Sequence, residues 1–214
     1  MDKKEQSKKI ILILKKSYPL AKCSLNYSNP LQLLIATILS AQCTDKRVNK
    51  TTPALFKRFK TAKDFASAHI VEIENIVKSC GFYRSKAKSI SETCKRLAAD
   101  YKGIVPNKIE DLLKFRGVAR KTANVVLGNV FHDPQGVVVD THMIRIANRL
   151  GLTKNKDPIK IEQDLNKIIP KKEWTMFSHY VIAHGRAVCK AQNPKCDVCP
   201  LKKYCEYYKK IYYR

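Results

Sequence analysis

The segment LKFRGVARKTANVVLGNVFHDPQGVVVD, residues 113–140, determines the fold expected for the rest of the chain. It predicts a helix, a tight turn at Phe115–Arg120, a second helix, and a short apolar run that ends at Asp140. A turn that leads into a helix points backbone N–H groups outward, where they can hold an anion such as phosphate. Lys121 lies at the positive end of the second helix, which disfavours its ammonium form. Because a neutral amine is a nucleophile, the segment predicts phosphate binding next to covalent chemistry.

The composition is strongly basic. Lys and Arg number 42 and Asp and Glu number 18, which gives a formal net charge of +24 over 214 residues. This balance favours a polyanionic partner, most simply a nucleic acid. A lysine bias from an AT-rich genome is the alternative, although it does not readily explain so few acidic residues. No apolar run is long enough for a signal peptide or a membrane span, so we expect a cytosolic protein without membrane contact.

The remaining segments predict helices and almost no strands, so the expected fold class is all-α. Capping residues and the 3–4 spacing of apolar residues set the expected boundaries. The expected helices are an amphipathic N-terminal helix, a central apolar helix opened by Asn29-Pro30, Lys46–Phe59 interrupted at Pro53, Thr61–Ala68, Ile70–Ser79, Ser85–Tyr101, Lys108–Phe115, Thr122–Val130, Asp140–Leu150 stopped by Gly151, Asp157–Ile169 and Glu173–Cys189. The basic, aromatic tail from Glu206 to Arg214 predicts a poorly ordered terminus, with stacking on nucleic acid as the alternative.

The eight cysteines fall into two groups. Because the cytosol is reducing, we do not expect disulfides. Four cysteines are scattered through the first half and are each predicted to be a small buried apolar residue, namely Cys23, Cys43, Cys80 and Cys94. The other four follow the pattern C-x6-C-x2-C-x5-C, which predicts a metal centre, and they are Cys189, Cys196, Cys199 and Cys205.

The cysteine spacing leaves two kinds of metal centre open. Zinc usually takes two C-x2-C pairs, whereas this segment has one such pair, Cys196 and Cys199. Four thiolates on a short looping segment suit a cubane iron–sulfur cluster, which the spacing therefore favours. Lys190 and Lys195 lie on the loop between the first two cysteines. A loop held by a metal would present these lysines to phosphate, and the alternative is that they are ordinary solvated charges.

Three features occur together and in order: the helix-hairpin-helix with Lys121, the segment VDTHMIRIANR at residues 139–149, and the cysteine pattern. Together they resemble the endonuclease III family over about residues 25–207. The resemblance implies an all-α fold of two helical domains. Residues 23–133 would form a six-helix module that contains the hairpin. Residues 1–22 and 134–214 would form a second domain, in which the four C-terminal cysteines hold a [4Fe-4S] cluster.

The resemblance also implies a reaction on damaged double-stranded DNA. The family combines a DNA glycosylase with a lyase that acts at abasic sites, and the damaged nucleotide would be flipped into a groove between the domains. Lys121 matches the family's nucleophile and Asp140 its catalytic carboxylate. Lys121 would attack the sugar C1′ and displace an oxidised pyrimidine, and the resulting Schiff base would permit β-elimination 3′ to the lesion. Taken alone, Lys121 would be a surface charge and Asp140 a helix N-cap.

Further positions match segments that contact DNA in the family. Gln42, in LSAQCTD, would fill the gap left in the duplex, although an isolated glutamine is usually a surface residue. Phe82, in GFYRSKA, would wedge into the base stack, with a place in the core as the alternative. His142 and Arg145 lie on the helix after Asp140 and would line the pocket or touch phosphate.

The hairpin turn departs from the family pattern Leu-Pro-Gly-Val-Gly at two positions. Arg116 replaces a proline and adds a phosphate contact beside Gly117 and Arg120. Ala119 replaces a glycine whose bare backbone approaches phosphate. If the turn needs a positive φ there, alanine costs about 1 kcal/mol. We therefore predict that Ala119→Gly tightens DNA binding.

Two other functions fit parts of the sequence. A monofunctional glycosylase of the same superfamily would share the fold and the cluster, but it would lack Lys121 and extend beyond Arg214 into a further domain. A non-catalytic, metal-containing DNA-binding module would need no nucleophile. We expect a bifunctional enzyme of base excision repair that acts as a monomer and is associated with the nucleoid of a bacterium or archaeon.

Overall fold

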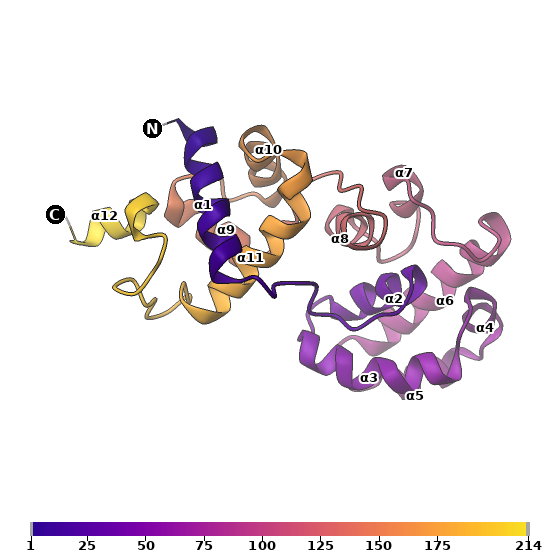
Figure 1. The fold of residues 1–214 in the computed structure, drawn as a ribbon. Coiled ribbons are helices and arrows are strands. Elements are labelled where there is room, and N and C mark those ends of the chain that lie inside the picture. The colour runs from indigo at the N-terminus through magenta and orange to yellow at the C-terminus, as the bar shows by residue number, and fades with distance from the viewer. Residues whose placement is uncertain (1, 213–214) are drawn as a thin grey trace. The chain divides into compact units, whose positions relative to one another are not determined.

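The computed structural model describes residues 2–212, whose helices are shown in Figure 1. These residues form twelve α-helices and two short 3-10 helices, and they contain no strand, which confirms the all-α prediction. The helices are α1 Lys3–Ser17, α2 Pro30–Ser40, α3 Asp45–Arg58, α4 Ala62–Ser67, α5 Ile70–Val77, α6 Tyr83–Asp100, α7 Ile109–Leu112, α8 Arg120–Val130, α9 Thr141–Leu150, α10 Pro158–Ile168, η1 Lys171–Glu173, α11 Trp174–Ala187, η2 Lys202–Tyr204 and α12 Glu206–Tyr212.

The chain forms two compact units. The first, called the hairpin unit below, is Cys23–Asp133. The second, called the cluster unit, combines Met1–Lys22 with Pro134–Arg214. Each unit has its own buried apolar core. No helix within residues 2–212 has the length and apolarity that crossing a bilayer requires.

The hairpin unit is built around α2. Its side chains are buried on every face from Leu33 to Leu39, and α2 contacts α3, α6 and α8. The sequence fixes where this helix begins, because the Asn29 side chain accepts the N–H of Gln32 at 3.0 Å and Pro30 occupies the first turn. An uncapped start would leave these donors unsatisfied in a helix that is central to the core.

Two boundary predictions in the hairpin unit are wrong. Pro53 lies inside α3 and does not interrupt it. Buried side chains on both sides of it, including Thr52 and Leu55, hold the helix on the core although proline removes one backbone hydrogen bond. The helix expected over Lys108–Phe115 is only the single turn α7, because the chain turns into the hairpin after Leu113, the last residue with helical backbone angles at this end.

The cluster unit packs α1 against α11 and α10, while α9 lies between α11 and α12 (Figure 1). The apolar face of α1 supplies three buried residues to the core, Ile10, Ile11 and Leu14. Gly151, at φ 76°, ends α9 as predicted, because glycine adopts this left-handed conformation without steric cost.

The C-terminal tail differs from the prediction of poor order. Residues Glu206–Tyr212 form α12, and the ring of Tyr207 lies 4.6 Å from the guanidinium carbon of Arg149. Packing against α9 therefore orders this stretch, which its composition alone does not indicate. Residues 213–214 of the predicted tail lie outside the described residues.

Candidate functional site

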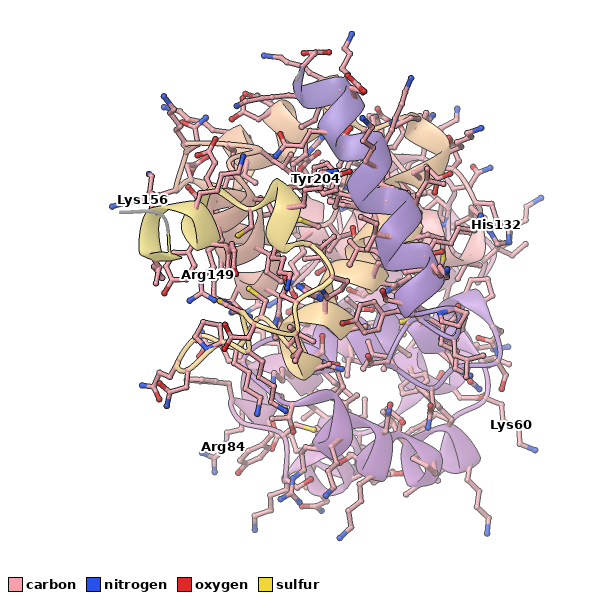
Figure 2. The ribbon with its side chains drawn as sticks, turned by 60° about the vertical axis from the view of Figure 1, so that its left-hand side comes forward. Lys60, Arg84, His132, Arg149, Lys156 and Tyr204 are labelled. Carbon is pink, nitrogen blue, oxygen red and sulfur yellow. The ribbon has the colours of Figure 1, made fainter. Side chains whose placement is uncertain are left out.

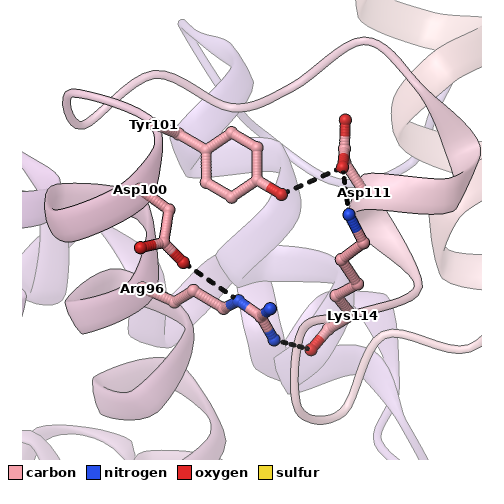
Figure 3. A network of polar contacts seen from close by, with 5 residues as sticks. All are labelled: Arg96, Asp100, Tyr101, Asp111 and Lys114. Carbon is pink, nitrogen blue, oxygen red and sulfur yellow. Dashed lines mark hydrogen bonds and ion pairs between the residues drawn. The ribbon is translucent and has the colours of Figure 1, made fainter.

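The hairpin turn of residues 113–119 is anchored to the end of α6 by a polar network (Figure 3). Asp111 accepts hydrogen bonds from the Tyr101 hydroxyl at 3.0 Å and from the Lys114 ammonium at 2.7 Å. Arg96 donates to the Lys114 carbonyl at 3.0 Å and to the Asp100 carboxylate at 3.3 Å. These contacts join the C-terminal end of α7 and the residue Lys114 beyond it to the end of α6, so the turn is held in place by more than its own backbone.

Apolar contacts hold the same turn from below. Phe115 and Val118 are almost fully buried, and the Phe115 ring meets the Tyr101 ring edge-on at 5.5 Å between centroids. Gly117 has a φ of 77°. A Cβ added there would lie 3.0 Å from the Ser89 hydroxyl oxygen, so the turn needs glycine for its backbone angle and for the space beneath it.

Ala119 carries no backbone strain. Its φ of −86° and ψ of 171° are extended, and it occupies the N-cap position of α8. The condition for strain at this position, a positive φ, is therefore not met. The positive φ falls two residues earlier, on the glycine that the turn retains.

The first turn of α8 begins with Arg120 and Lys121, and both residues are exposed. Ala119 provides no side-chain cap for the N–H groups of this turn. An N-terminus without a cap presents donors and the positive end of the helix to an anion. The predicted nucleophile therefore stands beside the part of the hairpin that is best suited to hold a phosphate.

Asp140 is the N-cap of α9. Its Oδ1 accepts the backbone N–H of Met143 at 2.8 Å, and the side chain is half-buried. This contact fixes the rotamer of the carboxylate and leaves the position of Oδ2 defined by the same geometry. The two readings of Asp140, a cap and a catalytic carboxylate, are thus compatible in one side chain.

Gln42 and Phe82 share an unusual backbone conformation. Gln42 has a φ of 50° and Phe82 a φ of 57°, and both side chains are exposed, Phe82 to 69%. The alternative that Phe82 belongs to the core is therefore wrong. Left-handed conformation costs a residue with a side chain about 1 kcal/mol, and such strain concentrates at functional positions. The two bends are also adjacent, because a Cβ on Gly81 would lie 3.8 Å from the Gln42 carbonyl oxygen.

Arg116 lines an open groove of the hairpin unit between α5, α6 and the turn. Its guanidinium lies 3.4 Å from the Glu92 carboxylate, and both side chains are substantially exposed. An exposed ion pair of this kind contributes little and exchanges readily for another anion. The groove contains three further basic residues that the sequence did not single out, Arg84 (labelled in Figure 2), Lys88 and Lys95.

The four C-terminal cysteines line a single pocket in the cluster unit. Among residues 2–212, no three His, Cys, Asp or Glu side chains lie close enough together to hold one metal ion. A zinc ion needs its thiolates within about 2.3 Å of one point, whereas a cubane cluster has ligands on separate corners. The four thiols gather around one pocket, and the spacing of the cysteines in the sequence favours a cluster there.

The thiols in this pocket are held by the protein around them. Burial raises the pKa of Cys199 to about 11, so iron must displace a proton when it binds there. The Tyr208 backbone N–H points at the Cys205 sulfur at 3.5 Å, and the Arg149 guanidinium lies 3.3 Å from the Cys189 sulfur. Such donors stabilise the thiolate forms that a cluster requires.

Two arginines of α9 bind the loop that begins at Cys189. Arg145 donates to the Cys189 carbonyl at 2.9 and 3.1 Å and lies 3.1 Å from the His142 ring. Arg149, labelled near this loop in Figure 2, donates to the carbonyls of Lys190 at 2.7 Å and Ala191 at 3.0 Å. Arg145 was predicted to line a pocket or touch phosphate, yet its guanidinium holds the first cysteine of the cluster segment.

His184 is a residue that sequence reasoning missed. It is buried, its Nε2 lies 3.6 Å from the Cys199 sulfur, and its Nδ1 lies 2.9 Å from the Tyr18 hydroxyl. Burial lowers the pKa of His184 to about 4, so the ring is neutral at pH 7 and carries one proton. If Tyr18 donates to Nδ1, that proton is on Nε2 and faces the sulfur. The only sequence signal was its position five residues before Cys189.

Lys190 and Lys195 are exposed on the loop between the first two cysteines, as the sequence predicts. Lys195 also lines the pocket that contains the four cysteines. The Lys195 backbone N–H donates to the Val188 carbonyl at 3.0 Å, and this hydrogen bond joins the two ends of the loop. The two ammonium groups are thus carried by a fixed backbone.

Comparison with known proteins identifies the family. Residues 35–171 match the HhH-GPD superfamily of base excision DNA repair proteins, and residues 189–205 match the iron-sulfur binding domain of endonuclease III. The second match confirms the iron–sulfur cofactor and decides against zinc. The chain is 54% identical over 203 residues to an endonuclease III from Synechocystis sp., an alignment that covers 95% of this chain and 93% of the relative.

Two solved structures are similar over nearly the whole chain. One is a non-covalent endonuclease III–DNA complex, with a TM-score of 0.92, 42% identity and complete coverage of both chains. The other is a trapped endonuclease III–DNA covalent intermediate, with a TM-score of 0.91, 42% identity and 99% coverage of both chains. The sequence and the fold thus lead to one conclusion: the chain belongs to the endonuclease III family of base excision DNA glycosylases and lyases.

Proposed function

We propose that this enzyme removes oxidised pyrimidines from double-stranded DNA and cleaves the strand 3′ to the resulting abasic site, with Lys121 as the nucleophile. The observation that carries the proposal is the placement of Lys121, exposed in the first turn of α8 directly after the hairpin turn. A solved relative has been trapped as a covalent intermediate with DNA, which supports a mechanism with a nucleophilic side chain.

The proposed reaction has two stages. The neutral Lys121 amine attacks the sugar C1′, and the damaged base leaves with the electron pair of the glycosidic bond. The adduct opens to a Schiff base, which acidifies the protons on the neighbouring C2′. Loss of one such proton expels the 3′ phosphate and breaks the strand. Water then hydrolyses the Schiff base and releases Lys121.

Asp140 is the proposed carboxylate of this reaction. Because Oδ1 accepts the Met143 N–H, Oδ2 would be the oxygen that takes part in the reaction. A carboxylate there would accept a proton from the attacking amine or stabilise positive charge that develops on the sugar. Because Asp140 is the N-cap of α9, the helix sets the direction of its side chain and no second side chain is needed to orient it.

The proposed DNA contacts come from three parts of the chain. The hairpin turn would hold a phosphate through the backbone of Gly117 and Ala119 and through Arg116 and Arg120. Gln42 would occupy the gap left by the flipped nucleotide, and Phe82 would stack beside it, since both are exposed on strained bends. The third part is the loop between Cys189 and Cys196, where Lys190 and Lys195 would bind phosphate.

Cys189, Cys196, Cys199 and Cys205 are the proposed ligands of the [4Fe-4S] cluster. The cluster, when bound, fixes the shape of the loop that carries the two lysines. Arg145 and Arg149 would support the same loop from α9, with His142 orienting Arg145 rather than meeting DNA itself. We further propose that the enzyme acts as a monomer and is associated with the nucleoid.

A panel of damaged duplexes tests this proposal. The panel would contain an oxidised pyrimidine, uracil, adenine mispaired with guanine, and a plain abasic site, each assayed with and without alkali treatment. We expect base loss and strand cleavage at the oxidised pyrimidine without alkali, together with cleavage of the abasic duplex. A monofunctional glycosylase would release a base but leave strands that break only in alkali. A non-catalytic binding module would release nothing.

A further inference from the structure

The groove between α5, α6 and the hairpin turn has a volume of about 500 Å³ and is lined mainly by charged side chains. Most of the lining comes from α6, at positions that recur every three or four residues, so these side chains share one face of the helix. Four of the charged residues are basic and two are acidic, so the groove favours an anion. They are Glu74, Arg84, Lys88, Glu92, Lys95 and Arg116.

The row of cations on α6 is long. Arg84, Lys88 and Lys95 are all exposed, and Arg84 and Lys95 are 11 positions apart in the same helix. At 1.5 Å per residue this separation is about 16 Å along the helix axis. One small anion cannot span that distance, whereas successive phosphates of a DNA strand, about 3.4 Å apart along the duplex axis, can do so. The length of the row therefore indicates a polyanion.

The groove joins two segments that are proposed to contact DNA. At one end of α6, Arg84 lies two residues after Phe82 and is labelled in Figure 2. Towards the other end, the hairpin turn rests on α6, where the Thr93 hydroxyl donates to the Arg116 carbonyl at 3.2 Å. The basic face of α6 therefore runs without a break from the bend at Phe82 to the hairpin turn.

One carboxylate competes for the cations of the groove. Glu92 lies 3.4 Å from the Arg116 guanidinium and 3.9 Å from the Lys88 ammonium. All three side chains are substantially exposed, so both ion pairs are weak and screened by solvent. A DNA phosphate forms stronger, charge-assisted hydrogen bonds with arginine and would take over these cations.

We propose that this groove binds the phosphate backbone of duplex DNA, with Arg84, Lys88 and Lys95 as contacts in addition to those of the hairpin turn. The proposal rests on the proposed function, because it needs the hairpin turn and Phe82 to meet the same duplex. Phosphate contacts carry no sequence information, so the groove would bind damaged and undamaged duplexes alike. Such contacts hold a protein on DNA while it slides and hops along the duplex.

Salt-dependent binding to an undamaged duplex tests the groove directly. In Lys88→Gln/Lys95→Gln, the slope of log K against log salt should flatten by up to about 1.8 units, since each phosphate contact contributes about 0.9. Lys60→Gln/Lys63→Gln should keep the wild-type slope. It removes two exposed lysines of the same unit that do not line the groove, and Figure 2 shows Lys60 on the opposite side of the unit from Arg84.

Arginine at the two groove positions provides a rescue. Lys88→Arg/Lys95→Arg keeps both charges and should keep the wild-type slope. Equal slopes in the two glutamine variants would overturn the proposal, and an acidic protein segment would then be the occupant that suits the charge of the groove.

Glu92→Gln tests the competition between carboxylate and phosphate. It should bind the undamaged duplex several-fold more tightly at low salt, because Arg116 and Lys88 become available to phosphate. Glu72→Gln is the matched control, since Glu72 is an exposed partner of an arginine in the same unit, Arg58, at 2.7 Å. Equal affinities of the two variants would overturn the placement of phosphate beside Glu92.

The groove and the proposed function can fail separately. If the wild type did not cleave an abasic duplex, the proposed function would be wrong, while the salt slopes on undamaged DNA would still decide the groove. If the groove variant kept the wild-type slope, the groove proposal would be wrong, while cleavage of damaged duplexes would still decide the function.

Discussion

The backbone N–H of Met143 donates to the Oδ1 of Asp140 over 2.8 Å, so the carboxylate of Asp140 caps α9 and takes its direction from the first turn of that helix. A cap is fixed by backbone geometry that the rest of the unit depends on. The orientation of Asp140 is therefore as rigid as the helix itself. The proposed catalytic carboxylate therefore needs no further side chain to position it.

Asp140→Asn separates the charge of this residue from its role as a cap. The amide oxygen can still accept the Met143 N–H, so thermal stability should stay near that of the wild type. Turnover on an oxidised pyrimidine should fall by about 10²-fold or more, because the amide cannot accept a proton. Single-turnover kinetics on a damaged duplex measure the loss.

Asp140→Ala is the matched control. It removes the charge and the cap together, so it should lose the same activity and about 1 kcal/mol of stability in addition. Full activity in the Asn variant would show that the carboxylate is a cap and nothing more.

Gly117→Ala should destabilise the hairpin unit. The added methyl meets the Ser89 side chain at 3.0 Å, and the φ of 77° costs a residue with a Cβ about 1 kcal/mol. Urea unfolding should show a lower midpoint with an unchanged slope. DNA affinity should fall as well, since the turn would shift to relieve the overlap.

Ala119→Gly serves as the comparison at the other end of the turn. Ala119 is extended, and glycine is the better N-cap, but glycine also gives the unfolded chain more conformational freedom; these effects are each about 1 kcal/mol and opposed, so stability should change little. Any gain in DNA affinity would then come from closer approach of the backbone to phosphate, and not from relief of strain. A large stabilisation would contradict the backbone angles.

Tyr18→Phe should make the cluster easier to lose. The Tyr18 hydroxyl contacts His184 Nδ1, and without it the ring proton is free to leave the nitrogen that faces Cys199. The decay of visible absorption in the presence of an iron chelator measures the rate. His184→Gln should accelerate decay further, since it removes the ring itself. Equal decay rates in all three proteins would contradict a role for this pair in holding the cluster.

The affinity for duplex DNA should fall steeply as salt increases. Each phosphate that a lysine neutralises contributes a slope of about −0.9 in log K against log salt. Replacing Lys190 and Lys195 by Gln should flatten the slope by up to about 1.8 units. Lys9→Gln is the control, because Lys9 is ion-paired with Glu5 on α1 and is not a proposed contact. Equal slopes in the two variants would mean that Lys190 and Lys195 are ordinary solvated charges and do not contact phosphate.

Local rules in the sequence predicted much of the fold. Asn29 and Asp157 cap α2 and α10 as expected, with N–H contacts of 3.0 and 2.9 Å, and Gly151 ends α9. Each of these helix ends is determined by four or five residues that are neighbours in the sequence. Pro53 was misjudged because the burial that keeps α3 continuous around it is a tertiary effect.

The parts of the site that sequence could not predict join distant segments. Tyr18 and His184 are 166 positions apart in the sequence, so the residues around either one do not indicate that the two side chains meet. Arg145 resembles a DNA contact from its segment, and only the fold shows that Cys189 accepts its hydrogen bonds.

Borohydride trapping on abasic-site DNA tests the central claim most directly. Reduction of a Schiff base gives a permanent protein–DNA link that denaturing electrophoresis resolves. The wild type should be trapped, and so should Lys114→Ala, a neighbouring hairpin lysine that pairs with Asp111 at 2.7 Å. Lys121→Ala should give no trapped product while it still binds the duplex. Trapping of Lys121→Ala at the wild-type level, or no trapping of the wild type, would contradict Lys121 as the nucleophile.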